Sequence, residues 1–356
     1  MSTSATDRAQ RPRVRDDARP RVCVLHVGGT IGMVRTDRGY MPMPGFLAAY
    51  LQGMPELARP EVPAHELVVL EPLLDSSDMS PADWLRIAAA IAERERDYDG
   101  FVVLHGTDTM AYTASALSFL LRDLSRPVIL TGSQLSLEHV RSDGRAHIIT
   151  AIILAGTCAI PEVSIYFGAR LLRGNRAQKV QSEDFLAFDS GNLPPLARVG
   201  VEIDVARHLV RPAGAGVVGP LALSHEPHVA ALRVFPGMRA KSLSHVLAPP
   251  TRALVLETYG AGNFPSARVE LLDAVREATE RGVVVVNCSQ CHGGSVRQHL
   301  YSTGHALARA GVTSGRDMTP EAALTKLYWL LGQGLGPEEV RLRVGEDLAG
   351  ELTPDP

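Results

Sequence analysis

The sequence has little lysine. Lysine occurs only at Lys179, Lys241 and Lys326. Every other residue among the lysines and arginines is arginine. Arginine stays protonated in proteins whereas lysine can release its proton, so a retained lysine is a candidate for proton-transfer chemistry. For at least two of the three, retention by chance is the simpler explanation.

Long apolar runs and blocks of one charge are also missing from the sequence. No run approaches the roughly 20 apolar residues that span a bilayer, and the net charge is −3. The lack of a basic or acidic block in the folded region argues against nucleic acid as a partner. Residues 1–20 are polar and arginine-rich and have no apolar signal core. We expect a disordered tail over 1–20 and a cytoplasmic protein that has no membrane partner.

Cysteine is too scarce and too scattered for a disulfide framework, with Cys23, Cys158, Cys288 and Cys291 as its only examples. Residues 288–292 spell the haem c attachment pattern, and a CxxC pair also occurs in redox sites and zinc sites. Each of these interpretations lacks its context, because no export signal, second ligand pair or thioredoxin-like unit accompanies the motif. We expect neither a metal nor an organic cofactor.

The length and the order of patterns predict two α/β domains. The chain has 356 residues, which exceeds the usual size of one domain, and 45% of them are hydrophobic. A strand, a polar turn and a helix recur four times before residue 160, as in doubly wound folds. We predict a larger N-terminal flavodoxin-like domain over 21–211, a Gly- and Pro-bearing linker over 212–222 and a smaller C-terminal α/β domain over 223–356.

The expected elements follow from apolar periodicity. Strands are predicted at 21–27, 66–70, 101–104, 127–131 and 163–167, and helices from 81, from 109 and over 143–155. In the second domain, strands are predicted at 231–235, 253–257 and 283–286, and helices at 241–247, 266–281, near 305–310 and at 320–331.

Thr107 and Asp108 stand where the buried strand at 101–104 runs into a helix. Ligands of open parallel sheets bind at the carboxyl ends of strands, where the next helix presents free N–H groups. A lone Thr-Asp join of this type is more often a helix cap. The functional interpretation gains support from a second join of the same kind earlier in the chain.

That earlier join is the glycine-rich turn after the first strand. Gly28, Gly29 and Gly32 allow tight turns and close backbone approach, and Thr30 is the nucleophile-capable side chain among them. The spacing is not GxGxxG, so a nucleotide-binding protein is a poor match. Residues 28–43 are predicted to form a loop or hairpin that could close over a site, or an ordinary surface hairpin. After the second strand, Asp75, Ser76 and Ser77 could hold an amino acid's charged groups or form a simple turn.

Six motifs in order resemble those of the bacterial L-asparaginases, especially the cytoplasmic type I group. They are GGTIGM (28–33), LDSSDM (74–79), HGTDTMAYTASALSF (105–119), TGSQ with RSDG (131–144), RGNRAQK (173–179) and YGAGN (259–263). The resemblance covers nearly all of the chain after residue 20 and implies an L-asparagine amidohydrolase that yields L-aspartate and ammonia. Because asparagine and glutamine differ by one methylene, a mixed glutaminase-asparaginase stays open. A catalytically silent amino-acid sensor is the non-enzymatic alternative.

The resemblance also implies a role for each matched residue. Thr30 matches the nucleophile that forms the acyl-enzyme, and Tyr40 the tyrosine that helps order and activate it. A second catalytic set activates the water or the nucleophile, and its members match Thr107, Asp108 and Lys179. The family's substrate contacts match Asp75, Ser76, Ser77, Thr107, Asp108 and Ser133.

Self-association and regulation are implied in the same way. Asn263 matches a residue contributed across a subunit boundary, which implies a homodimer or the family's tetramer. Glu257, Cys288 and Cys291 lie where some type I members bind asparagine as an effector, so the resemblance leaves allostery open.

Overall fold

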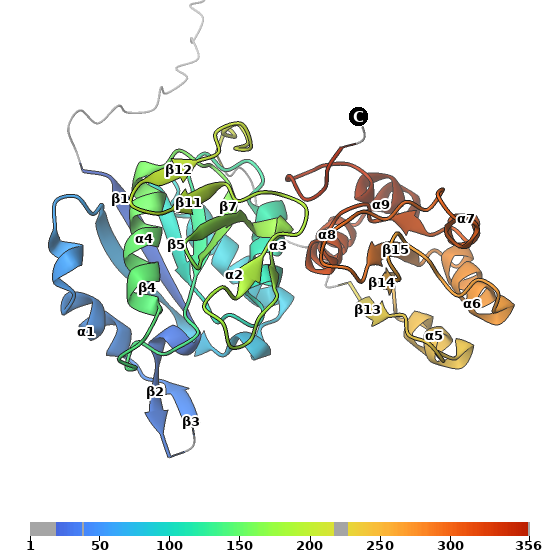
Figure 1. Cartoon of the computed structure of the whole chain (residues 1–356), viewed down its shortest axis with the longest axis horizontal. Helices are drawn as coiled ribbons and strands as arrows, with labels where there is room; N and C mark the ends of the chain where they lie inside the picture. Colours follow the sequence, from blue (N-terminus) through green and yellow to red (C-terminus); the bar gives the residue numbers. More distant parts are fainter. Residues whose placement is uncertain (1–18, 38, 217–226, 355–356) are drawn as a thin grey trace, which may run out of the picture.

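Two α/β lobes follow one another along the chain (Figure 1). The computed structural model describes residues 19–37, 39–216 and 227–354. The tail predicted over 1–20 lies outside the described residues except for its last two, of which Arg19 donates to the carbonyls of Arg59 and Val62. The linker predicted over 212–222 is described only as far as residue 216.

The N-terminal lobe is built on an eight-stranded sheet with the order β12-β11-β8-β7-β6-β5-β1-β4. Its five parallel strands have the doubly wound order 2-1-3-4-5 when numbered among themselves, which is the flavodoxin-like order. The predicted fold class is therefore confirmed. The parallel strands are β1 (Arg21–Gly28), β4 (Ala64–Leu74), β5 (Gly100–Leu104), β6 (Val128–Thr131) and β7 (Val163–Phe167). The antiparallel edge, which was not predicted, consists of β8 (Arg170–Arg173), β11 (Ala197–Val199) and β12 (Ile203–Val205).

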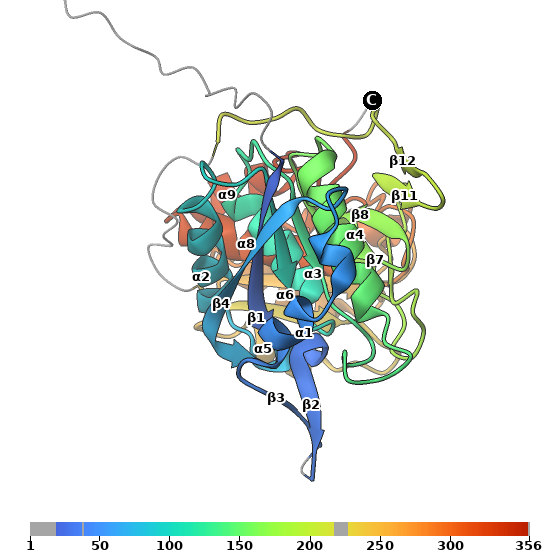
Figure 2. The same ribbon diagram turned by 90° about the vertical axis from the view of Figure 1, so that its left-hand side faces the viewer.

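Helices cover both faces of this sheet (Figure 2). Alternate residues of each strand point to opposite faces, so Leu25 and Val103 pack in one core and Val24 and Val102 in the other. Helices α2 (Pro81–Ala92) and α3 (Met110–Leu120) cover the first face, and α1 (Phe46–Gln52) and α4 (Gly144–Thr157) cover the second. This burial on both faces explains why the strands read as continuous apolar runs.

Several short elements connect the strands and helices of this lobe. They are the 3-10 turns η1 (Thr30–Gly32), η2 (Pro55–Ala58), η3 (Ser76–Asp78) and η4 (Gly174–Arg176), the hairpin β2 (Met33–Thr36) with β3 (Gly39–Pro42), and the pair β9 (Gln178–Lys179) with β10 (Phe188–Asp189). The hairpin expected within 28–43 is present and projects away from the lobe (Figures 1 and 2).

The C-terminal lobe has a four-stranded parallel sheet of β13 (Val229–Arg233), β14 (Ala253–Thr258), β15 (Val284–Ser289) and β16 (Thr313–Ser314). One face packs on α5 (Ala240–Leu247), α6 (Val269–Glu280) and α7 (Ser302–Arg309), and the other on α8 (Pro320–Gly332) and α9 (Pro337–Val344). The strand predicted at 231–235 lies two residues earlier, and the helix predicted from 266 begins at Val269.

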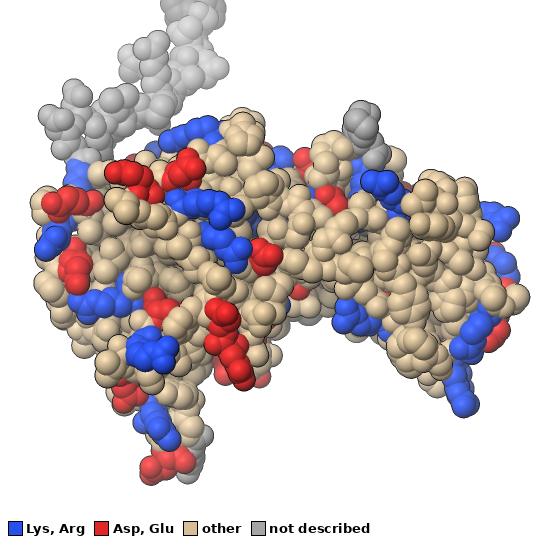
Figure 3. Space-filling view, viewed as in Figure 1, with Lys and Arg blue, Asp and Glu red and all other residues tan. Residues whose placement is uncertain are grey.

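The lobes meet mainly through α3 and α8. Phe119 stacks on Trp329 with 6.2 Å between ring centroids, and Trp84 meets Tyr328 edge to face at 5.9 Å. The Arg122 guanidinium lies 5.1 Å from the centre of the Trp329 ring. On the face that Figure 3 displays, acidic and basic side chains are interspersed and the outline is notched between the lobes. Within 19–37, 39–216 and 227–354, no helix has the length and apolar character needed to cross a membrane.

Candidate active site

Three turns touch one another backbone to backbone at the carboxyl ends of β4, β1 and β5. A β-carbon added at Gly28 would lie 2.0 Å from the Leu74 carbonyl oxygen, and one at Gly29 would lie 2.3 Å from the Gly106 nitrogen. Gly28 and Gly29 also have φ values of 128° and 91°, which strongly favour glycine. The glycines therefore allow the turn that carries Thr30 to lie between the turn of Asp75 and the turn of Thr107.

Neither Thr107 nor Asp108 is the N-cap residue of helix α3. The residue that caps α3 is Thr109, whose hydroxyl donates to the Ser76 carbonyl at 2.7 Å. The Thr107 side chain is buried and Asp108 is exposed. Both are therefore available to contacts other than the first turn of α3.

Lys179 contacts both of these residues, as expected if the three act together. Its Nζ lies 2.9 Å from Thr107 Oγ1 and 2.6 Å from Asp108 Oδ1. The lysine side chain is 19% exposed, whereas that of Asp108 is 64% exposed. A lysine that gives up its proton could accept the Thr107 hydroxyl proton in this arrangement, so the three side chains can relay a proton.

Ser133 lies in the turn after β6, close to the same edge of the sheet. Its hydroxyl is buried and has no hydrogen-bond partner among the residues that the structure describes. A β-carbon at the preceding Gly132 would lie 2.3 Å from the His105 carbonyl oxygen, so this turn packs directly on the turn that leads to Thr107. An unpartnered buried hydroxyl is available to a ligand.

Asp143 holds this turn in place, and the sequence did not identify it. Its carboxylate accepts from the backbone N–H of Gln134 at 3.0 and 3.1 Å and from that of Leu135 at 3.1 Å. His147 adds a contact between Nδ1 and the Gly132 carbonyl at 2.9 Å, and burial lowers the pKa of this imidazole. The signal in the sequence was the position of Asp143 directly before a helix and nine residues after TGSQ.

Gln134 is a second residue that sequence reasoning missed. Its amide nitrogen donates to the carbonyls of Ser182 and Asp184 at 2.9 and 3.0 Å, which fastens the loop after Lys179. Its amide oxygen lies 3.5 Å from Thr107 Oγ1. No local pattern reveals such a residue, because its partners lie 27 to 50 positions away.

Asp75, Ser76 and Ser77 form a tight turn at the end of β4. Asp75 Oδ1 accepts from the backbone N–H of Ser77 at 3.0 Å and from its hydroxyl at 2.9 Å. Asp75 and Ser77 are exposed and Ser76 is buried. The carboxylate is thus oriented by its own turn while its second oxygen stays available.

Two buried histidines lie beneath these turns and are neutral near pH 7. Burial lowers the pKa of His105 to about 4, and its ring nitrogens lie 2.6 Å from the Gly106 carbonyl oxygen and 2.9 Å from Thr113 Oγ1. Burial also lowers the pKa of His26 to about 4, and its Nε2 would lie 2.7 Å from a β-carbon added at Gly32. Both histidines therefore pack as uncharged groups under the site.

Two of the expected site residues are not brought to this cluster within the single chain. Tyr40 lies on the projecting hairpin with 47% of its surface exposed, and no hydrogen bond joins it to Thr30 in the described part of the chain. Asn263 lies after β14 in the other lobe, where its side-chain oxygen accepts from the Thr303 hydroxyl at 2.8 Å. Tyr40 would need the hairpin to move, and Asn263 would need a second subunit.

The cysteine motif divides between the core and the surface. Cys288 is buried on β15, where burial raises the pKa of its thiol, and Cys291 is exposed. Across the described ranges, no three His, Cys, Asp or Glu side chains are grouped so that they could hold a metal ion.

Comparisons with known proteins find relatives along nearly the whole chain. Residues 21–211 match the family model described as Asparaginase, N-terminal, and residues 228–342 match the Glutaminase/Asparaginase C-terminal domain. L-asparaginase 1 of Escherichia coli is 47% identical over 334 residues, which cover 94% of this chain and 98% of that protein. The 60 kDa lysophospholipase of Homo sapiens is 44% identical over 358 residues, covering 94% of this chain and 62% of that protein.

A solved structure extends the similarity to three dimensions. The crystal structure of L-asparaginase I from Vibrio cholerae superposes with a TM-score of 0.86 at 46% sequence identity, and the match covers 94% of this chain and 100% of that one. Both lobes and the polar turns between strands and helices are included in the matched range. The chain therefore belongs to the asparaginase family.

Proposed function

We propose that the chain hydrolyses the side-chain amide of L-asparagine to give L-aspartate and ammonia. Its family membership makes it an amidohydrolase, and the relatives named L-asparaginase support this substrate. The observation that carries the proposal is the contact of Lys179 with Thr107 and Asp108 beside the turn of Thr30. The protein acts as a homo-oligomer in the cytoplasm and needs no metal or organic cofactor.

The proposed reaction has two steps. Thr30 Oγ1 forms a bond to the amide carbon, the proton of its hydroxyl passes to the amide nitrogen, and the carbon–nitrogen bond breaks so that ammonia leaves. Water then attacks the resulting ester, which releases aspartate and restores the Thr30 hydroxyl. A threonine hydroxyl is a weak nucleophile and needs a base within hydrogen-bond reach, directly or through water. Thr107, Asp108 and Lys179 supply that proton transfer, which is typically worth about 10²- to 10⁴-fold in rate.

The substrate's charged groups are held by the neighbouring turns. The free carboxylate oxygen of Asp75 and the carboxylate of Asp108 suit the α-ammonium group, and the hydroxyls of Ser76 and Ser77 suit the α-carboxylate. The unpartnered hydroxyl of Ser133 supplies a further hydrogen bond. Closure of the hairpin would bring Tyr40 over Thr30 to order it, and Asn263 of a second subunit would complete the site.

The first test is ammonia release from L-asparagine and, separately, from L-glutamine, with no metal added. Release from asparagine far above glutamine supports the proposal, and comparable rates support a mixed glutaminase-asparaginase. A sigmoidal dependence on asparagine would add an effector site at Glu257, Cys288 and Cys291. Release from neither substrate by folded protein would indicate an amino-acid sensor.

Two substitutions test the assigned roles. Thr30→Ala and Lys179→Met should each remove most turnover, about 10²-fold or more, because both side chains act on the transition state. The matched control is Lys241→Met, since Lys241 is exposed on α5 and touches no site residue in the described chain. Wild-type rates in either site variant would contradict the role assigned to that residue.

A further inference from the structure

Lys179 lies on a short strand at the border between the two lobes. Strand β9 contains only Gln178 and Lys179 and pairs only with the equally short β10, outside the eight-stranded sheet. A two-residue ladder is too short to fix a strand by itself. The position of the Lys179 ammonium group must therefore depend on contacts made by the residues around it.

Ala177 and Phe188 anchor this strand pair in the N-terminal core, and its polar side chains bond to the other lobe. Arg176, three residues before Lys179, has 2% of its side chain exposed and forms a forked pair with Asp317, with nitrogen–oxygen distances of 3.2 and 2.7 Å. It also donates to the Glu351 carbonyl at 2.7 Å and to Thr353 Oγ1 at 3.2 Å. The residue two positions before β9 thus has a buried guanidinium group, and the partners of this group, Asp317, Glu351 and Thr353, belong to the C-terminal lobe.

The residues next to Arg176 and Lys179 also bond to the C-terminal lobe. Asn175 donates to the Ala349 carbonyl at 2.9 Å. Gln178 donates to Glu321 Oε2 at 3.1 Å, and its Oε1 lies 3.1 Å from His292 Nδ1. Each polar side chain that flanks Lys179 on this strand and on η4 therefore has a partner outside the N-terminal lobe.

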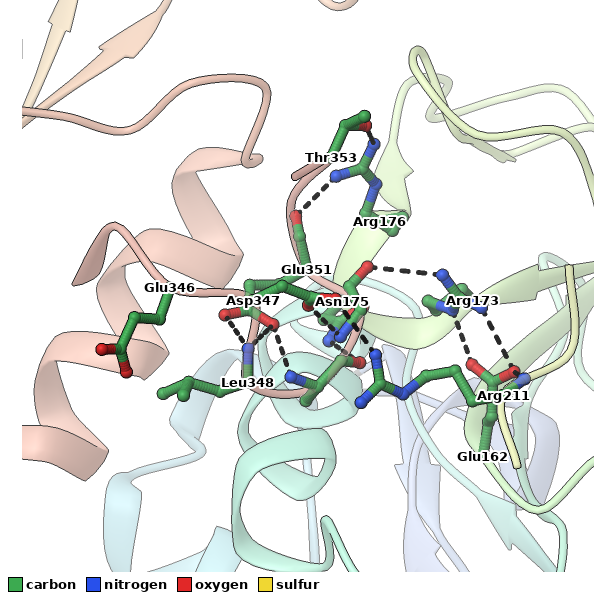
Figure 4. Close-up of polar contacts among 12 residues, drawn as sticks. Glu162, Arg173, Asn175, Arg176, Arg211, Glu346, Asp347, Leu348, Glu351 and Thr353 are labelled. Atoms are coloured by element: carbon green, nitrogen blue, oxygen red, sulfur yellow. Dashed lines mark hydrogen bonds and ion pairs between the residues drawn. The ribbon is translucent and has the colours of Figure 1, made fainter. Parts of the chain in front are cut away.

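The partner segment, residues 345–353, is itself rigidly anchored (Figure 4). The Glu351 carboxylate pairs with Lys326 of α8, and both side chains are fully buried. The same carboxylate accepts the backbone N–H groups of Leu348 and Ala349. Thr353 donates to Asp317 through its backbone at 2.8 Å and through its hydroxyl at 2.6 Å. A segment held by a buried ion pair and several hydrogen bonds can act as a fixed support.

We propose that Arg176, held by Asp317 and segment 345–353, is a positioning residue that sets the place of Lys179 against Thr107 and Asp108. The C-terminal lobe then takes part in catalysis without touching the substrate at this point. The inference rests on the proposed function, since it concerns the lysine assigned to proton transfer there.

The kinetic test uses Asp317→Asn and Arg176→Lys, each of which removes the charged fork while keeping the side chain similar in size. Displacing a catalytic group by about 1 Å can cost 10²-fold, so kcat should fall about 10- to 100-fold. KM should change less than kcat, because Asp75, Ser76 and Ser77, which hold the substrate's charged groups, do not contact β9, although Asp108 does. The control is Arg211→Gln, which removes a pair with Asp347 of the same segment at 3.2 Å without touching β9.

A second readout follows Lys179 directly and needs no turnover. The chain has only three lysines, so reductive methylation with ¹³C-formaldehyde gives few NMR signals besides that of the terminal amine. Lys179→Arg and Lys241→Arg assign the signals. The chemical shift of the Lys179 signal should change in Asp317→Asn and Arg176→Lys and stay the same in Arg211→Gln, while the Lys241 signal stays constant throughout.

The outcomes separate the positioning role from a purely structural one. Variants that melt at lower temperature but keep kcat and the Lys179 signal would overturn the proposal. If both variants fail to fold, Thr353→Val is used, because it removes only one hydroxyl from the network, and an unchanged Lys179 signal would again overturn it. If the wild type releases no ammonia, the proposed function fails while the Lys179 signal still decides the positioning role.

Discussion

Gly106 shows how a single position sets the shape of the site. A β-carbon added there would lie 2.5 Å from Ser76 Oγ and 2.7 Å from Ser76 Cβ, although no positive φ requires glycine. The glycine is therefore needed for space, since it allows the turns after β5 and β4 to touch. This contact places Thr107 and Ser76 on adjoining turns.

We predict that Gly106→Ala raises KM for the substrate more than it lowers kcat. The added methyl must push Ser76 aside, and overpacking typically costs about 1 to 3 kcal/mol. If that cost falls wholly on substrate binding, KM rises about 5- to 150-fold. Gly53→Ala is the matched control, because its β-carbon would lie 3.4 Å from the Tyr50 carbonyl oxygen, an ordinary contact distance, and the φ of Gly53 is −81°. Steady-state kinetics that show equal KM values for the two variants would contradict this interpretation.

For single residues, the sequence identified some of the side chains of the site but not the side chains that hold them in place. Thr107, Asp108 and Lys179 were expected to act together, and the structure brings them within 2.9 Å. Asp143 and Arg176 were not singled out, because their roles depend on loop shape and on partners in another lobe. Such pairings leave no periodic trace in a single sequence.

Among the elements, segment 345–353 is bound through Thr353 to Asp317, and this attachment depends on pH. Burial raises the pKa of Asp317, but the hydrogen bonds from Arg176 and Thr353 outweigh it, so the pKa lies below its ordinary value. An acid whose pKa is lowered by folding stabilises the folded state above its unfolded pKa, near 3.9 for Asp, and loses this contribution as the pH falls through the lower folded value.

We expect this loss to appear in the free energy of unfolding. Between pH 5 and pH 2, the wild type should lose about 1.5 to 3 kcal/mol that Asp317→Asn has already lost at neutral pH, the range for hydrogen bonds to charged groups. Urea titrations at each pH measure the difference between the two proteins. Asp204→Asn, which changes an exposed carboxylate on β12, should follow the wild type. A difference between wild type and Asp317→Asn that does not change with pH would refute the assignment.

Whether an element could be predicted depended on its length and burial. The strand at 163–167 was predicted with its observed bounds, and the helix from 81 begins where expected, because Pro81 follows the capping residue Ser80. Helix α9 was missed because its apolar residues Val340, Leu342 and Val344 alternate instead of following a helical period, and α1 was missed because its 7 residues are too few to show one. The short strands β9 and β10 form only through long-range packing, which no local pattern reveals.

For the whole molecule, the separation of Asn263 from the cluster around Thr107 allows a test of subunit sharing. Asn263 is bonded to Thr303 within the C-terminal lobe, and Tyr259 pairs with it through the backbone. If Asn263 completes the site of a neighbouring subunit, each active site combines residues from two chains. Two variants damaged at different residues could then repair each other.

We predict that mixing Thr30→Ala with Asn263→Ala restores activity. Random pairing in a two-fold dimer leaves about a quarter of the sites intact, so activity should approach a quarter of the wild-type value. Thr30→Ala mixed with Lys179→Met is the matched control, because both changes affect residues of the same lobe and no intact site should form. Ammonia release after joint unfolding and refolding measures both mixtures, and equal activity in the two would exclude a shared site.

The link between Arg176 and Thr353 joins residues 177 positions apart in the chain. A ribosome therefore makes Thr30, Thr107 and Lys179 long before it makes the residues that hold β9 in place. The N-terminal lobe can fold as a unit during synthesis, as domains generally do. If Arg176 sets the place of Lys179 as proposed, this lysine reaches its final position only when the second lobe has emerged and docked, and the nascent chain becomes active only late in translation.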